Sequence, residues 1–321
     1  MAYFKCTLRV LRYVILSLIN HVFAKDDLVL EDHLLASHVF QTVYTDDWLN
    51  CVQLCFDEPH CISYNFKINH GPCELVECRV EDICHRDDSL IYSRGFVFQQ
   101  LRTIGKDDCK MSPKKKFSAN ADRSLQFSRN ENPGRVSIRD LASLEAFTIG
   151  FWMKTDDKLN KGTPFSYGTS EQSNELLLYN YQEFHLIIHG ESRRSTISAT
   201  DGSWHHICAT WESVTGSWQL LKNGVVVAAG RDLQRGHVIP QGGVLVLGQG
   251  QDLAAGEYAG HQSFIGELTS VQLWHFVLPA AEINRLLLSC QMGRGNVLAW
   301  SDVLNGTFNG AVELVSTSSC N

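Results

Sequence analysis

The chain has 321 residues, of which 44% are hydrophobic, with 28 Lys and Arg against 35 Asp and Glu, for a formal net charge of −7. This length and apolar content suit one or two globular domains. The acidic balance argues against nucleic acid as a main partner. No stretch reaches the ~20 apolar residues of a membrane-spanning helix.

The first residues have the pattern of a secretory signal peptide. Lys5, Arg9 and Arg12 precede an apolar run from 13 to 24, which is short for a membrane anchor. We therefore predict a cleaved signal over residues 1–24 and a secreted, extracellular chain. Cleavage would remove three positive charges and change the net charge from −7 to −10 (−7 − 3).

The cysteines are unevenly distributed. Of the eleven, Cys6 lies in the predicted signal, six fall between Cys51 and Cys84, and four are widely spaced beyond them. Ten cysteines in an extracellular chain favour a disulfide framework. The distribution predicts a small disulfide-bonded module followed by a larger domain with its own core.

The small module begins with a helix. Asp46 or Asp47 is the candidate N-cap, and Trp48, Cys51 and Cys55 then share one helical face. The segment CISYNF, 61–66, alternates as a strand. About 70 residues bury little apolar surface, so disulfides worth ~2–4 kcal/mol each are the expected support. Zinc is the alternative, but the spacing lacks paired zinc knuckles.

These segments, with CEL at 73–75, resemble a PAN/apple domain over 34–101. The resemblance implies the disulfides Cys51–Cys73 and Cys55–Cys61. Proximity suggests Cys78–Cys84 as a third pair. Apple domains bind proteins or carbohydrates, which would give this module a contact role.

After a lysine-rich connector, 102–118, the sequence changes to an alternating pattern. In AFTIGFWMKT, 146–155, every second residue is apolar and shares one face. Asn223-Gly224 predicts a type I′ hairpin turn. Many short strands between such turns predict a mainly β fold, an antiparallel two-sheet sandwich or jelly roll. Pro279 predicts one helix, from about 280 to 288, with Ile283, Leu286 and Leu287 on its inner face.

The segment DGSWHHICATWES, 201–213, contains two histidines and a cysteine. In a strand only His206 and Cys208 of these three share a face. A metal centre needs further ligands, and a cysteine nucleophile needs a base held by a third group; the sequence locates neither. A buried strand is the favoured interpretation.

The same segment fits the pentraxin signature H-x-C-x-[ST]-W-x-[ST] at His206–Ser213. Further segments, among them GTPFSYG, SNELLLY and GGVLVLGQGQD, resemble the long neuronal pentraxins in the same order. The similarity covers roughly Cys109 to Cys320 and implies a pentraxin domain, 109–321. Pentraxins have a two-sheet jelly-roll fold, which agrees with the alternation.

The resemblance implies a calcium site, altered at several positions. The positions that retain an oxygen donor are Asn174, the carbonyl of Gln251, Asp252 and Gln262. The positions at which the family acid is replaced are Ser173, Gly250 and Ala259. Calcium affinity depends on ligand charge and rigidity, so we expect one weak site or none. Glu175 or Glu257 is a possible substitute ligand.

The family also has an apolar ligand pocket beside the calcium, and Leu177, Tyr179 and Phe184 occupy the corresponding positions. The ligands implied are phosphocholine, phosphoethanolamine and glycans. A plain core strand is the alternative for these residues. Asn305-Gly306-Thr307 is an N-glycosylation sequon.

Two cysteines lose their usual pairing. The family partner of Cys208 is replaced by Gly150. Long pentraxins imply the disulfide Cys109–Cys290, which leaves Cys208 and Cys320 to pair with each other, link subunits or remain free.

Three functions fit these features. The first is a secreted recognition protein that forms a cyclic homo-oligomer, a pentamer by resemblance. The second is a calcium-independent adhesive protein of the extracellular matrix. The third is a glycosidase, which is disfavoured because no strand carries the two carboxylates that glycoside hydrolysis requires. We therefore expect a non-enzymatic protein.

Overall fold

A computed structural model describes residues 28–35, 38–45, 47–68, 71–77, 90–102, 123–130, 132–139, 141–253, 257–258, 262–287 and 295–316. The chain divides into two compact units, Met1–Lys114 and Lys115–Asn321, here called the small unit and the large unit. The expected signal peptide, the pairs Cys78–Cys84 and Cys109–Cys290, and Cys320 lie outside the described residues. Among the described helices, none is long and apolar enough to cross a bilayer.

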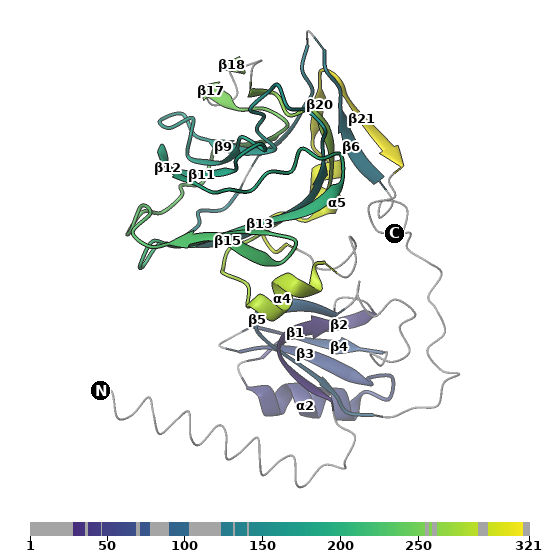
Figure 1. Ribbon diagram of the computed structural model, residues 1–321. Coiled ribbons are helices and arrows are strands. Elements are labelled where there is room, and N and C mark those ends of the chain that lie inside the picture. The colour runs from purple at the N-terminus through teal and green to yellow at the C-terminus, as the bar shows by residue number, and fades with distance from the viewer. Residues whose placement is uncertain are drawn as a thin grey trace. The chain divides into compact units, whose positions relative to one another are not determined.

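The small unit is an antiparallel sheet with one helix (Figure 1). Its strand order is β1-β5-β3-β4-β2. The elements are β1 Val29–Leu35, β2 Val39–Tyr44, α2 Trp48–Asp57, β3 Ser63–Lys67, β4 Pro72–Val76 and β5 Leu90–Gln100. Helix α2 contacts β3 and β4, so its buried face closes one side of the sheet.

The core of the small unit is built around two disulfides. Cys51–Cys73 joins α2 to β4, with 5.6 Å between the Cα atoms, and Cys55–Cys61 joins α2 to the residues before β3, with 5.2 Å. All four half-cystines are buried, beside Tyr64. These are the two pairings expected for the small module.

Both ends of α2 are satisfied by side chains. Asp47 is the N-cap, and its carboxylate accepts a hydrogen bond of 2.9 Å from the Leu49 N–H. At the other end the Arg102 guanidinium donates to the carbonyls of Phe56, at 2.7 Å, and Cys61, at 2.7 Å. A cation at a helix C-terminus also complements the helix dipole.

The large unit consists of two seven-stranded antiparallel sheets (Figure 1). The first has the order β12-β11-β10-β9-β16-β7-β20, and the second β15-β14-β13-β8-β19-β6-β21. The first contains β7 Arg135–Arg139, β9 Phe165–Gly168, β10 Leu176–Tyr179, β11 His185–Ile188, β12 Glu191–Arg194, β16 Val244–Leu247 and β20 Thr307–Asn309. The second contains β6 Arg123–Phe127, β8 Ala146–Lys154, β13 Trp204–Glu212, β14 Ser217–Lys222, β15 Val225–Gly230, β19 Gly266–Trp274 and β21 Val312–Ser316. A small hairpin pairs β17 Gln251–Leu253 with β18 Glu257–Tyr258.

The core of the large unit lies between its two sheets, as the alternating pattern predicted. Phe147, Ile149, Phe151 and Met153 of β8 are all at most 1% exposed and belong to one buried cluster. The cluster also takes residues from the facing sheet, among them Leu178. The predicted mainly β, two-sheet fold is confirmed.

The predicted turn and helix are also present. Asn223 and Gly224 both have positive φ angles, 50° and 77°, in the turn between β14 and β15. Helix α4, Ala280–Arg285, follows Pro279 and buries Ile283. A second short helix, α5 Trp300–Leu304, was not predicted.

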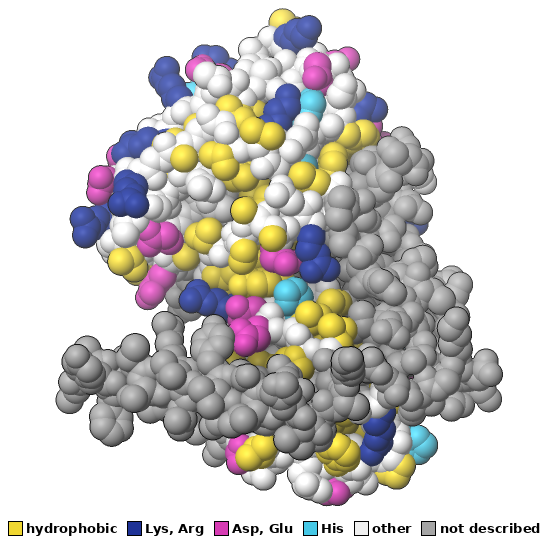
Figure 2. Space-filling view, turned by 60° about the horizontal axis from the view of Figure 1, so that its bottom comes forward, with side chains coloured by type: hydrophobic (Ala, Val, Ile, Leu, Met, Phe, Trp, Pro, Cys, Tyr) yellow, Lys and Arg dark blue, Asp and Glu magenta, His cyan; other side chains and the backbone are white. Residues whose placement is uncertain are grey.

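Charged side chains of both signs are interspersed on the face shown in Figure 2.

Candidate functional site

Strand β13 is buried on both faces. Ile207 and Ala209 pack into the core between the sheets, while His206 and Cys208, on the other face, are 3% and 0% exposed. Burial raises the pKa of the Cys208 thiol to about 12 and lowers that of His206 to about 4. Both groups are therefore neutral near pH 7, so this strand holds no reactive thiolate.

Cys208 is the free cysteine of the described residues, and it lies directly opposite Gly150 on β8. A Cβ built on Gly150 would lie 3.3 Å from Nε2 of His206. The position of the missing partner cysteine is thus filled partly by the His206 ring.

Strand β10 separates the predicted pocket residues into two groups. Leu176 and Leu178 belong to the core cluster, whereas Leu177 and Tyr179 lie on the opposite face of the sheet. Phe184 belongs to the core cluster and is 0% exposed. Phe184 alternates in step with Leu186 and Ile188, the core residues of β11, and therefore faces the core. It does not line the face that Leu177 and Tyr179 form.

His185 takes the place beside Tyr179 instead. The two residues pair across β10 and β11, and their rings meet edge to face with centroids 5.7 Å apart. Burial raises the pKa of Tyr179, and burial, with Arg194 nearby, lowers the pKa of His185. Sequence reasoning missed His185; continuing the strand alternation across the turn after β10 would have found it.

The structure brings Gln262 against the second predicted calcium loop. A Cβ built on Gly250 would lie 2.1 Å from Oε1 of Gln262. The Gln262 amide therefore fills the space that the family's acidic side chain would enter. The Gln262 carbonyl also accepts a 2.9 Å hydrogen bond from the Thr163 N–H, which fixes its backbone.

Gln251 directs its side chain into the protein. Its Nε2 donates to Oγ of Ser166 at 3.2 Å and to the carbonyl of Val244 at 3.0 Å, over strands β9 and β16. The Gln251 side chain is therefore not a ligand, and coordination by its backbone carbonyl stays a prediction. Asp252 follows within β17, but its side chain and Ala259 lie outside the described residues.

Asn174 and Glu175, at the start of β10, have different environments. Asn174 is half-buried, and its backbone accepts from the Gly190 N–H at 2.9 Å and donates to Gln172 Oε1 at 3.1 Å. Glu175 is 1% exposed, and its two carboxylate oxygens contact His189 and His237. Because both oxygens are engaged there, Glu175 is not a free substitute ligand for calcium.

The large unit is thus an antiparallel two-sheet jelly roll, an architecture that many recognition domains share. Residues 126–314 match the Pentaxin family. The chain belongs to the pentraxin family, and pentraxins are generally non-enzymatic recognition proteins.

Individual relatives agree with this assignment. The chain is 40% identical over 182 residues, 56% of its length, to mouse sushi, von Willebrand factor type A, EGF and pentraxin domain-containing protein 1, of which it covers 5%. It is 35% identical over 190 residues, 59% of its length, to human neuronal pentraxin-2, of which it covers 44%. The chain therefore spans less than half the length of these curated relatives.

A solved structure agrees as well. The native heptameric SAP-like pentraxin of Limulus polyphemus matches with a TM-score of 0.55 and 25% identity. The match covers 63% of this chain and 98% of that one. The jelly roll of the large unit therefore accounts for a whole pentraxin subunit.

Proposed function

We propose that the chain is a secreted recognition protein that binds phosphate-bearing or glycan ligands through a single weak calcium site. The observation that carries the proposal is the arrangement of Gln262 against the 250–252 segment, whose Gln251 side chain is hydrogen-bonded to Ser166 of β9. Pentraxins are generally extracellular and calcium-binding. The predicted signal peptide supports secretion.

The weakness of the site follows from its donors. Asn174, the Gln251 carbonyl and Gln262 are neutral, so Asp252 supplies the single formal charge. Extracellular calcium modules bind at ~10⁻⁴–10⁻³ M, and the charge count of the ligands is one determinant of that value. A site with one carboxylate belongs at the weak end of this range.

The ligand would be oriented by the face of β10 and β11 beside the calcium. Tyr179 is partly exposed and offers aromatic surface there, whereas Leu177 is 2% exposed and Nε2 of His185 is buried beneath the surface. Apolar walls with few polar groups are typical of small-ligand sites. This composition suits the methyl groups of a choline or the ring of a sugar.

Assembly would compensate for weak single sites. The Limulus relative is described as heptameric, and we propose a cyclic homo-oligomer here, a pentamer by family resemblance. A ring that presents several identical sites to a repetitive surface gains ~10²–10⁴ in avidity. Phosphorylated or glycosylated surfaces meet that requirement.

The small unit would add a second contact. Its α2-anchored disulfides support assignment as a PAN/apple domain over 34–101, joined by a linker, 102–118, to a pentraxin domain, 109–321. Such a domain would bind a protein or carbohydrate. Asn305 is exposed at the end of α5, as an N-glycosylated residue requires.

Calcium titration tests the proposal. We expect isothermal calorimetry of the full mature chain to show one saturable site in the millimolar range, lost in Asp252→Asn and retained in the exposed control Asp232→Asn. Binding of phosphocholine or phosphoethanolamine should then disappear with a chelator. No heat up to several millimolar calcium would contradict the proposal and favour the calcium-independent adhesive function.

A further inference from the structure

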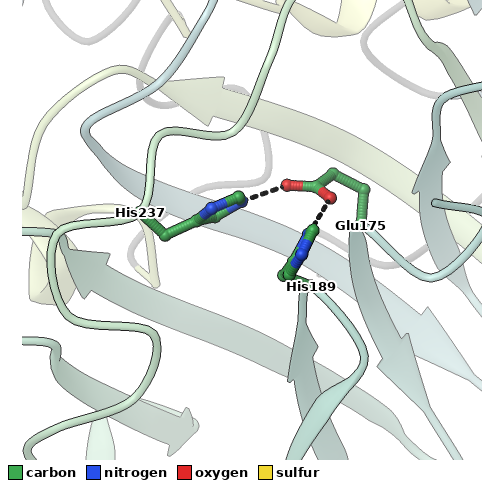
Figure 3. Close-up of side chains that lie close together, drawn as sticks. All are labelled: Glu175, His189 and His237. Carbon is green, nitrogen blue, oxygen red and sulfur yellow. Dashed lines mark hydrogen bonds and ion pairs between the residues drawn. The ribbon is translucent and has the colours of Figure 1, made fainter. Parts of the chain in front are cut away.

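We propose that Glu175, His189 and His237 form a site for a divalent transition metal, of which zinc is the expected occupant. Glu175 directly precedes β10, His189 lies in the turn between β11 and β12, and His237 lies in the loop between β15 and β16. The three side chains converge on one point (Figure 3). The cluster adjoins Asn174 of the first predicted calcium loop, but none of its ligand atoms belongs to a predicted calcium donor, and the inference does not depend on the proposed function.

The ligand atoms already lie close to coordination geometry. Oε2 of Glu175 is 2.9 Å from Nδ1 of His189, and Oε1 is 2.5 Å from Nε2 of His237. One ligand atom from each residue lies within 4.8 Å of the others. Ligands of a tetrahedral zinc ion are about 3.3 Å apart, given bonds of about 2.0–2.1 Å. To reach that spacing, the two hydrogen-bonded pairs would open by about 0.4–0.8 Å and the remaining pair would close by up to about 1.5 Å.

The charge of the site favours a cation. The Glu175 side chain is 1% exposed, and within the described part of the chain its ion-pair partners are these two imidazoles and no Lys or Arg. A buried carboxylate requires compensation by a positive charge. The two imidazole rings face each other with centroids 4.4 Å apart, which would place two like charges together if both were protonated. A metal ion provides the positive charge while both imidazoles remain neutral.

The backbone holds the three residues in place. The His189 N–H donates to the Glu175 carbonyl at 2.9 Å, so the turn is attached to the carboxylate's own strand. His189 itself has a φ of 46°, which a non-glycine residue adopts at a cost. In the opposing loop the His237 carbonyl accepts from Ser213 Oγ at 2.5 Å, and its N–H donates to the Gln234 carbonyl at 3.0 Å. Such preorganisation lowers the cost of binding.

The chemistry selects the metal class. One carboxylate oxygen and two imidazole nitrogens suit zinc, copper or nickel, whereas calcium and magnesium prefer oxygen donors alone. The His189 and His237 side chains are 46% and 20% exposed. Solvent therefore reaches the site from the histidine side, where water or an external ligand would complete the coordination. The metal would connect the β11–β12 turn to the loop before β16.

Zinc titration of the chelator-treated full chain, in competition with a chromophoric zinc chelator, tests this site. We expect one zinc ion per chain with a dissociation constant in the micromolar range or tighter. Removing a group that only hydrogen-bonds to a metal ligand costs about 10–100-fold in metal affinity. Glu175→Gln and His237→Gln remove a ligand itself, so each should weaken zinc binding by at least about 100-fold. His275→Gln, a change at an exposed histidine, and Asp252→Asn, at the calcium site, should leave it unchanged.

Cobalt provides a second readout that does not depend on affinity. Co²⁺ bound to the wild-type chain should show visible absorption of a four- or five-coordinate nitrogen and oxygen site, absent in His237→Gln, with circular dichroism verifying that both chains are folded. If the wild-type chain and the two ligand variants bind zinc with equal affinity, the proposal is overturned. The cluster would then be a hydrogen-bonded carboxylate and imidazole group.

Discussion

The small unit and the large unit are both antiparallel β structures, but they use cysteine in opposite ways. The larger buried cluster of the small unit has seven residues, four of them half-cystines. The cluster of the large unit has 34 residues and no cysteine, and its Cys208 lies buried and unpaired. A small core gains little from burial and depends on covalent links, whereas β13 of the large unit packs around Cys208 without a bridge at that position.

Both units bury polar side chains, some with and some without hydrogen-bond partners. In the large unit, burial alone lowers the pKa of His206 to about 4, and its Nδ1 has no hydrogen-bond partner. In the small unit the buried Asn65 is hydrogen-bonded to both the N–H and the carbonyl of Leu35. In the small unit, Oε1 of Gln100 is also buried without a hydrogen-bond partner among the described atoms, so neither core satisfies every polar atom.

Removal of the disulfide with the larger sequence separation should produce the largest difference in stability between the two units. Cys51→Ala with Cys73→Ala opens a loop with a sequence separation of 22, which is worth about 3 kcal/mol. We expect hydrogen exchange at β3 and β4 to accelerate strongly while β8 and β13 stay protected. Cys208→Ala removes a cysteine that forms no disulfide, and it should leave the hydrogen exchange of β3 and β4 unchanged. Full protection of β3 and β4 without the disulfide would show that this small core is sufficient alone.

The second prediction concerns His206 and pH. Because its folded pKa is about 4 against an ordinary value of 6.5, the unfolded chain binds the additional proton between these pH values. The contribution of neutral His206 to the free energy of unfolding is therefore complete above pH 6.5. It is lost as the pH falls toward 4, a change of about 3 kcal/mol. Denaturant unfolding of the large unit should show this slope, and His206→Leu should remove it. An identical pH profile in both chains would contradict the assignment.

A bridge can also be restored to the large unit. Gly150→Cys places a second cysteine opposite Cys208, and we expect the disulfide to stabilise the unit by about 2 kcal/mol, less than the entropic estimate because the new Cβ crowds His206. The thermal midpoint should be higher in oxidised than in reduced protein. Gly150→Ala, which adds the Cβ without the sulfur, controls for crowding. Equal midpoints in both redox states would show that the strands do not admit the bridge.

The sequence predicted much of the fold because the signals are local. The alternation of β8, the Asn223-Gly224 turn and the Asp47 cap each depend on residues that are neighbours in the chain. The predicted ligand positions were found by resemblance, since calcium donors from separate loops have no local pattern. Phe184 was misplaced because it was assigned by resemblance alone, whereas the alternation of β11 puts it on the core side with Leu186 and Ile188.

By itself, then, the sequence determined the alternating strands, the turns and the position of the cysteine-rich module, while the replacement of three acidic calcium ligands stays a prediction from resemblance. Only the tertiary structure decided that Glu175 faces His189 and His237 instead of the calcium loops. It also decided that Gln262 covers Gly250. These residues are up to 62 positions apart in the chain, and their contacts follow from the pairing of strands and the path of loops between them.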